Sequence, residues 1–212
     1  MVDIAYIVTV MVVVLMSMTL HEAMHAFMGY WLGDSTAKEE GRLTLNPIRH
    51  IDPVLTVALP LILAIIGGPI FGGAKPVPFN PNNVKWGEWG AALVGLAGPV
   101  TNLVLSFVFF ILSVFVGDAS EFVRTFLQLS VIVNLGFFVF NMIPIPPLDG
   151  SRVLYAIAPD GIRQVMAMME QYGIVIILAV VMFGSQFIGK FIQSSIESIL
   201  RVYAALFGVS VV

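Results

Sequence analysis

The chain has 212 residues, of which 58% are hydrophobic and 11% are charged, and its mean hydropathy is +0.97. This balance excludes a soluble globular domain, whereas a bilayer accepts helices of about 20 apolar residues. The net charge of -3 and the scattered Lys and Arg residues give no support to nucleic-acid binding. Because cysteine is absent, a metal can be held only by His, Asp or Glu.

We predict an all-α membrane protein, a multi-span bundle of about five or six hydrophobic segments with a short membrane-associated β-hairpin and a re-entrant segment. One integral-membrane domain is expected over 1–212, with its core motifs in 20–152 and accessory segments in 153–212. The first apolar run is interpreted as a retained span and not a signal peptide, because it lacks preceding Lys or Arg and a small-residue cleavage site.

The first predicted span runs from about residue 4 to 32. The polar stretch 33–52 alternates apolar and polar residues in "RLTLNP", which favours a hairpin near the membrane surface. Segment 53–71 is apolar but broken by Pro60 and several glycines into pieces about as long as a half-span, which leaves a crossing and a re-entrant path both open. Prolines in 74–83 favour an extended segment.

Two clear spans follow at 90–116 and at about 122–143. The second runs into "NMIPIPPLDG" at 141–150, where three prolines must unwind the helix. A last pair of apolar stretches is predicted at 172–189 and 191–212.

The distribution of positive charge predicts an orientation. No Lys or Arg precedes Lys38, and the same loop also carries Arg42 and Arg49. This asymmetry favours an outside N-terminus and a cytoplasmic 33–52 loop, although Lys75 in the next loop weakens it. We therefore expect a multi-pass protein of a prokaryotic cell membrane, with its active site nearer the cytoplasmic face.

Residues 21–25 form an HExxH motif at the end of the first predicted span. On a helix this spacing puts His21 and His25 on one face, where they can grip a single zinc ion. Glu22 points close to that metal and can take a proton from a zinc-bound water, whose pKa falls to about 7. Ionisable residues cost about 2.5 to 3.5 kcal/mol each near the bilayer centre, so the motif indicates function and not internal pairing that anchors helices.

A catalytic zinc site usually has three protein ligands, so a third ligand is needed. The candidates are Asp149, His50, Glu39 and Glu40. Asp149 is favoured because it follows a proline-broken span end, deep in apolar sequence, with only Arg152 as a nearby cation. His50 ranks second, and the glutamates lie in a polar loop where hydrated charges need no partner.

Together these features resemble the site-2 protease family of intramembrane zinc metalloproteases. The resemblance rests on five segments spread over most of residues 20 to 152: HEAMH at 21–25, NPIRHIDP at 46–53, KPVPFNP at 75–81, GPVTN at 98–102 and NMIPIPPLDG at 141–150. No inserted PDZ-like domain fits between the motifs, so the chain resembles a compact member.

The resemblance implies one Zn²⁺ per chain, held by His21, His25 and Asp149, with Glu22 as the general base. It also implies hydrolysis of a transmembrane substrate protein within the lipid bilayer, usually after an upstream protease has trimmed that substrate. Two asparagines, Asn102 and Asn141, become candidates for binding the substrate or polarising the scissile carbonyl. Interhelical hydrogen bonding is an equal alternative for Asn102 and Asn141, and capping of freed backbone is a further one for Asn141.

Substrate capture is expected at the "RLTLNP" hairpin and the "KPVPFNP" strand, because an exposed strand edge can pair with an unwound peptide. The rival function is a metal-ion or proton transporter that uses His21, Glu22, His25 and Asp149 as an ion pathway. A membrane scaffold with a structural zinc is a third possibility. Glu22 discriminates, because a transporter has no need for an acid that lies beside the metal without binding it.

The two zinc-binding spans must run in the same direction, because His21 and Asp149 both lie at the C-terminal ends of their spans. An odd number of crossings must then separate them. The Gly- and Pro-broken segment 53–71 is therefore expected to return to the side from which it entered.

Overall fold

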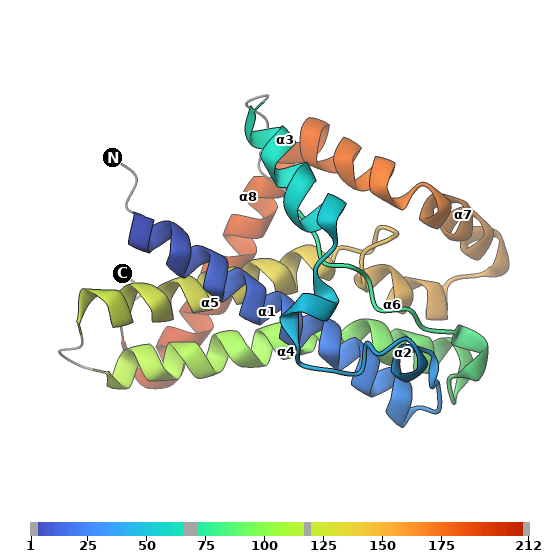
Figure 1. Ribbon diagram of the computed structural model, residues 1–212, viewed down its shortest axis with the longest axis horizontal. Helices are drawn as coiled ribbons and strands as arrows, with labels where there is room; N and C mark the ends of the chain where they lie inside the picture. The colour runs from blue at the N-terminus through green and yellow to red at the C-terminus, as the bar shows by residue number, and fades with distance from the viewer. Residues whose placement is uncertain (1–3, 66–71, 117–119, 210–212) are drawn as a thin grey trace.

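The computed structural model describes residues 4–65, 72–116 and 120–209, and Figure 1 shows their arrangement. Every regular element in these ranges is a helix, so the predicted all-α membrane class is confirmed. The elements are α1 Ile4–Trp31, α2 Thr36–Glu39, the 3-10 helix η1 Pro47–His50, the π-helix η2 Pro53–Ala58, α3 Leu59–Ile65, the 3-10 helix η3 Pro81–Asn83, α4 Gly87–Phe115, α5 Glu121–Asn141, α6 Gly150–Ile157, α7 Asp160–Gln171 and α8 Gly173–Phe207.

Three of the described helices, α1, α4 and α5, are long and apolar enough to cross a membrane. Helix α7 and the start of α8 meet at an angle of 83° and give a fourth span at most, if the bent pair counts as one. The described chain thus has three or four candidate spans, fewer than the five or six hydrophobic segments predicted. The apolar stretch after His50 forms only short helices, which accounts for part of the difference.

Helices α1, α4 and α5 form a three-helix bundle in which each helix contacts the other two (Figure 1). The chain runs in the same direction along α1 and α5 and in the opposite direction along α4. The C-terminal ends of α1 and α5 therefore lie at the same end of the bundle. This satisfies the condition on direction that a metal shared by His21 and Asp149 imposes.

The hairpin predicted for 33–52 is wrong. Asp34 instead accepts hydrogen bonds from the backbone N of Thr36 at 3.1 Å and from its hydroxyl at 2.6 Å, which starts α2. Asn46 likewise accepts from the backbone N of Ile48 at 3.1 Å at the start of η1. Such local bonds from side chains to the backbone compete with strand pairing, and here they prevail over the apolar-polar alternation.

Segment 53–71 begins as the π-helix η2 and continues into α3, while residues 66–71 lie outside the described ranges. Its two ends lie together, because Lys75 N donates to His50 O at 2.9 Å and Gly73 N donates to Leu55 O at 3.0 Å. The chain thus leaves and returns at one place. Such a path is compatible with the predicted re-entrant segment, and α4 is the one candidate span that the described residues provide between α1 and α5.

The two C-terminal stretches predicted at 172–189 and 191–212 form one continuous helix, α8. Lys190 is exposed on that helix, and an exposed lysine does not interrupt the backbone ladder. The last turns of α8 attach to the bundle through Tyr203, which packs with Val131 and Leu135 of α5.

Candidate active site

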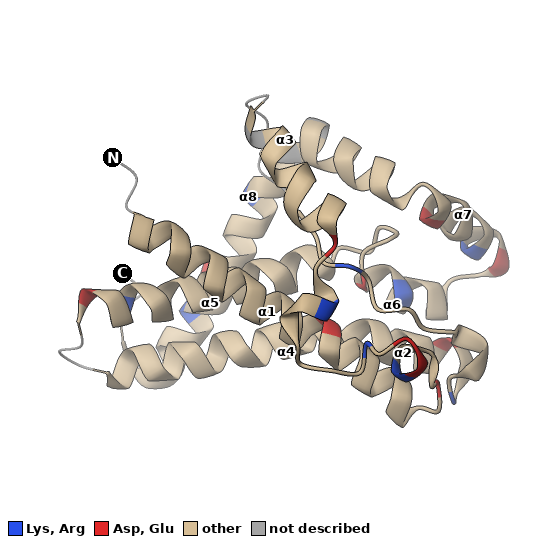
Figure 2. Cartoon of the chain, in the orientation of Figure 1, with Lys and Arg blue, Asp and Glu red and all other residues tan. Residues whose placement is uncertain are grey.

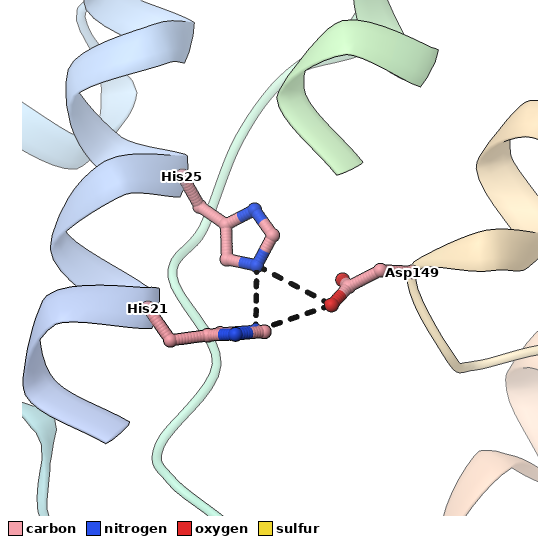
Figure 3. Close-up of side chains that lie close together, drawn as sticks. All are labelled: His21, His25 and Asp149. Carbon is pink, nitrogen blue, oxygen red and sulfur yellow. Dashed lines mark hydrogen bonds and ion pairs between the residues drawn. The ribbon is translucent and has the colours of Figure 1, made fainter. Parts of the chain in front are cut away.

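The two histidines of the HExxH motif lie on one face of α1 (Figure 3). Both side chains are buried, and their Nε2 atoms are 3.0 Å apart. The spacing of four residues produces this approach, because side chains one helical turn apart lie on the same face. His21 and His25 therefore present two nitrogen atoms to one point.

Asp149 reaches the same point from the turn between α5 and α6 (Figure 3). Its Oδ2 atom lies 3.1 Å from His21 Nε2 and 3.5 Å from His25 Nε2. Asp149 occupies the N-cap position of α6, yet its side chain makes no capping bond. Arg152, the nearby cation noted in the sequence, pairs with Glu170 instead. The Asp149 carboxylate is thus directed to the histidines and not to its own helix or to Arg152.

Close packing of the backbone makes this geometry possible. A Cβ atom on Gly150 would lie 2.4 Å from Met142 O, so only glycine lets the turn fold back on the end of α5. A Cβ atom on Gly95 of α4 would lie 2.9 Å from Arg152 Cβ and 3.1 Å from Asp149 O. Gly150 thus lets the turn fold back on the end of α5, and Gly95 lets α6 approach α4, which together bring Asp149 to the histidines.

The histidine rings are oriented by acceptors behind them. His25 Nδ1 lies 2.7 Å from the backbone oxygen of Val94, and His21 Nδ1 lies 2.5 Å from Asn102 Oδ1. A ring whose Nδ1–H donates keeps a lone pair on Nε2, which is the form that binds a metal. With both rings so held, lone pairs of His21, His25 and Asp149 converge and repel unless a cation lies between them.

The separations of the three atoms fit zinc. Zinc ligands at bond lengths of about 2.0 to 2.2 Å in a tetrahedral site lie about 3.3 Å from one another. The three observed separations of 3.0, 3.1 and 3.5 Å bracket this value. Only His21, His25 and Asp149 form such a cluster among the residues that the structure describes.

Gly98 of α4 completes the space around the cluster. A Cβ atom there would lie 2.4 Å from His25 Nε2 and 2.6 Å from His21 Nε2. The sequence analysis included Gly98 in the GPVTN motif without giving it a role. The signal that could have identified it is a glycine in the middle of an apolar helix, next to polar motif residues, since small residues allow helices to approach closely.

Glu22 lies beside the cluster and not in it. Its Oε2 atom accepts a hydrogen bond from Val77 N at 3.1 Å. Val77 belongs to segment 72–80, which has no regular secondary structure and contacts α1 through this bond. Glu22, which the motif predicts as the general base, therefore lies on the same turn of α1 as His21 and is partly covered by segment 72–80.

The lower-ranked ligand candidates lie elsewhere. His50 is fully buried, with Nε2 2.9 Å from Thr44 O and Nδ1 3.4 Å from the Arg42 guanidinium. Glu39 accepts from Ser35, and Glu40 is exposed. None of the three residues joins the His21, His25 and Asp149 cluster within the described ranges.

The two predicted asparagines differ in position. Asn102 is fully buried behind His21, and its amide nitrogen donates to Asn134 Oδ1 at 2.8 Å. Asn141 donates to Phe137 O of its own helix at 3.0 Å, close to the point where α5 ends. In this structure Asn102 contacts His21 of the cluster, and Asn141 bonds a backbone carbonyl of its own helix. Their predicted contacts with substrate stay predictions.

Charged residues gather at the end of the bundle that holds the cluster (Figure 2). The only charged residue in α1 is Glu22, and the only one in α4 is Glu88, at the start of that helix. Further charges surround this end on α2, α6 and α7. Arg42 is buried there, donates to Lys75 O at 2.6 Å, and burial lowers the pKa of its guanidinium below the usual value. The cluster thus lies where the apolar helices meet polar structure.

An apolar helical bundle with a buried His-His-Asp cluster and an acid beside it defines an integral-membrane metalloprotein. Peptidase family M50 matches residues 117–185, which include Asp149. YwhC of Bacillus subtilis, named as a zinc metalloprotease, is 37% identical over 206 residues, covering 92% of this chain and 91% of that protein. Rip2 of Mycolicibacterium smegmatis, also named as a zinc metalloprotease, is 34% identical over 170 residues, covering 77% of this chain and 62% of that protein.

The chain therefore belongs to the M50 zinc metalloproteases of the site-2 protease type. A shorter match of 63 residues, 44% identical, links it to MJ0611 of Methanocaldococcus jannaschii, which carries the same kind of name. No solved structure matches the chain significantly. The predicted family, enzyme class and zinc cofactor are confirmed, and the transporter alternative is not favoured.

Proposed function

We propose that this zinc metalloprotease is an endopeptidase that cuts a peptide bond within or next to a transmembrane segment of another membrane protein. The observation that carries the proposal is the position of the cluster. His21 and His25 lie on α1, a helix apolar enough to span a membrane, and both are buried against α4. A protease whose ligands lie on a membrane span meets its substrate in or at the bilayer.

In this proposal His21, His25 and Asp149 would hold one zinc ion. Zinc held there would lower the pKa of a water molecule to about 7 and would polarise the scissile carbonyl. The role of the Glu22 carboxylate is to accept a proton from water and to pass it to the leaving amine. Because Glu22 follows His21 directly in α1, the same helix turn sets the distance between base and metal.

The proposed reaction needs water, which the hydrocarbon core excludes. The cluster lies at the polar end of the bundle, where charges on α2, α6 and α7 surround it (Figure 2). We expect water to enter from this end, which the charge pattern of the sequence favours as the cytoplasmic side. A prokaryotic cell membrane and an upstream protease that first shortens the substrate are part of the same proposal.

We infer that segment 72–80 controls access to Glu22, because Val77 N donates to the Glu22 carboxylate. In an extended chain the backbone groups of alternate residues face the same edge, and Lys75 and Val77 both direct their N–H groups inward, to His50 O and Glu22. The opposite edge presents Pro76 and Pro78, which have no N–H. An unwound substrate can therefore donate hydrogen bonds to the carbonyl groups of Pro76 and Pro78 but receives none from these two residues. It reaches Glu22 only when Val77 moves.

Val77→Pro is expected to raise the cleavage rate several-fold. Proline keeps the extended conformation but removes the N–H that covers Glu22, and hydrogen bonds to charged groups contribute about 1.5 to 3 kcal/mol. The measurement is the initial rate of cleavage in liposomes. Val77→Ala is the matched control, because it keeps the N–H and is expected to leave the rate unchanged. A slower rate in Val77→Pro would show that the bond positions Glu22 productively.

His21→Ala is expected to abolish stoichiometric zinc. The wild-type chain should carry about one zinc, since His21, His25 and Asp149 offer one ligand atom each to one point. Metal analysis of the purified protein measures the content. His50→Ala, which alters a buried histidine outside the cluster, should keep the zinc. Loss of zinc in His50→Ala but not in His21→Ala would show that the zinc site lies at His50 and not at His21.

The proposed substrate class is tested by trapping. Cells that produce Glu22→Gln should accumulate uncut membrane proteins that are absent when the wild-type chain is present. The cut site in each trapped protein is then located by mass spectrometry after incubation with the wild-type chain. Cuts within or next to a transmembrane segment support the proposal, whereas cuts confined to soluble domains contradict it.

A further inference from the structure

A row of buried polar side chains leads away from His21 and joins the three candidate spans, α1, α4 and α5, through hydrogen bonds. Ser17 of α1, Asn102 of α4 and Asn134 of α5 are each 3% exposed or less. Asn102 Nδ2 donates to Asn134 Oδ1 at 2.8 Å, and Asn134 Nδ2 donates to Ser17 Oγ at 2.9 Å. The row ends at His21, whose Nδ1 atom lies 2.5 Å from Asn102 Oδ1.

A backbone carbonyl sets the direction of every bond in the row. Asn134 Nδ2 also donates to Ser130 O at 2.8 Å, and a carbonyl oxygen can only accept. The amide nitrogen of Asn134 must therefore face Ser130, and its oxygen must face Asn102. Asn102 in turn must present its nitrogen to Asn134 and its oxygen to His21.

This direction determines the tautomer of His21. Because Asn102 offers an oxygen, His21 Nδ1 carries the proton, and the lone pair stays on Nε2. If the Asn102 amide were reversed, its N–H would face Nδ1 and the neutral ring would place its proton on Nε2. Nε2 is the atom that faces His25 and Asp149, and a protonated nitrogen cannot bind a metal.

The two histidines differ in this respect. His25 donates to the backbone oxygen of Val94, an acceptor that cannot be reversed. His21 depends on a side-chain amide, which has a donor end and an acceptor end in nearly the same shape. The His21 ring therefore needs groups that select the end of the Asn102 amide facing it. Asn102 Nδ2 donates to Asn134 Oδ1 at 2.8 Å and, over the longer distance of 3.4 Å, to the backbone oxygen of Ser17, so Asn134 makes the shorter of these two bonds.

We propose that Asn134 is a positioning residue of the zinc site, which acts through Asn102 to keep His21 in its metal-binding tautomer. Asn134 touches neither the cluster nor a substrate, so it is not a catalytic residue. The inference concerns zinc affinity and does not depend on which substrate is cut. Simple joining of helices by polar side chains is the alternative, and it predicts an effect on stability alone.

The test measures the zinc affinity of the purified protein by competition with a chelator, without substrate. Loss of an outer-shell partner typically lowers metal affinity by about 10- to 100-fold. Asn102→Ala is expected to lower zinc affinity by about a hundredfold, and Asn134→Ala by about tenfold. The double variant should bind zinc no more weakly than Asn102→Ala, because Asn134 acts only through Asn102.

Ser106→Ala is the matched control for helix joining. Ser106 is fully buried on α4, and its Oγ atom lies 3.1 Å from Tyr203 Oη of α8, so it joins two helices as Asn134 does. Its replacement should lower the thermal stability of the protein and leave zinc affinity unchanged. Ser130→Ala is a second control, because the Ser130 hydroxyl bonds only to Phe126 O of its own helix.

Asn134→Asp is the rescue variant. A neutral carboxyl group has the same shape, accepts from Asn102 and donates to Ser130 O, so zinc affinity should return to within about threefold of the wild-type value. If Asn134→Ala fails to fold, Asn134→Ser replaces it, since a serine hydroxyl bonds the preceding helical turn and does not reach Asn102. Wild-type zinc affinity in Asn134→Ala or Asn134→Ser, or additive losses in the double variant, would overturn the proposal.

Discussion

Replacing Glu22 with Gln is expected to leave zinc bound and to reduce the rate of peptide-bond cleavage by about 10²- to 10⁴-fold. The amide has the shape of the carboxylate and can still accept from Val77 N, which lies 3.1 Å from Glu22 in the wild-type protein. It cannot take a proton from water at neutral pH. The measurements are zinc content per chain and the cleavage rate of a substrate identified by trapping.

Glu39→Gln is the matched control for this prediction. Glu39 is exposed on α2 and lies outside the metal cluster, so its replacement should change neither zinc content nor cleavage. Full cleavage activity in Glu22→Gln would contradict the protease mechanism. Loss of cleavage together with loss of zinc would show that Glu22 supports the metal and would leave the identity of the base open to a new assignment.

Gly98→Ala is expected to remove zinc from the protein and to abolish cleavage. The added Cβ would lie 2.4 Å from His25 Nε2 and 2.6 Å from His21 Nε2, distances at which something must shift. The rings cannot withdraw without losing the bonds that His21 makes to Asn102 and His25 to Val94. We expect a loss of zinc affinity greater than the roughly 100-fold that an outer-shell change can cause, measured by chelator competition.

Gly136→Ala supplies the control for Gly98→Ala. Gly136 lies in the middle of α5, and a Cβ atom there would meet nothing within 4 Å. This substitution should keep zinc and activity and stabilise the helix by roughly 0.5 to 1 kcal/mol. If Gly98→Ala bound zinc as tightly as Gly136→Ala, the close approach of α4 to the histidines would be wrong.

The class of protein and the metal-binding chemistry could be read from local sequence. Apolar runs of membrane-spanning length predict α1, α4 and α5 without any knowledge of packing. The HExxH spacing acts within one helical turn, so His21 and His25 meet wherever α1 lies. Asp149 was found by a different argument, because an acid beside a proline-broken span end needs a partner. The structure brings Asp149 to within 3.1 Å of His21 Nε2.

Two parts of the fold could not be read in this way. The alternation in "RLTLNP" is a pattern that a strand shares with a capped loop, and the bonds made by Asp34 and Asn46 selected the loop. The apparent break at Lys190 had no proline to interrupt the backbone, so α8 continues through it. Both errors came from treating side-chain polarity as if it determined backbone hydrogen bonding.

The sequence alone determined that this chain is a helical membrane protein with a two-histidine zinc motif and an acid beside it. Only the tertiary structure decided that Gly98 faces both imidazoles, that Asn134 stands behind Asn102, and that Val77 covers Glu22. These contacts join residues far apart in the chain. They depend on how each helix is rotated about its own axis and how closely α1, α4 and α5 approach, and no local pattern in the sequence encodes that rotation.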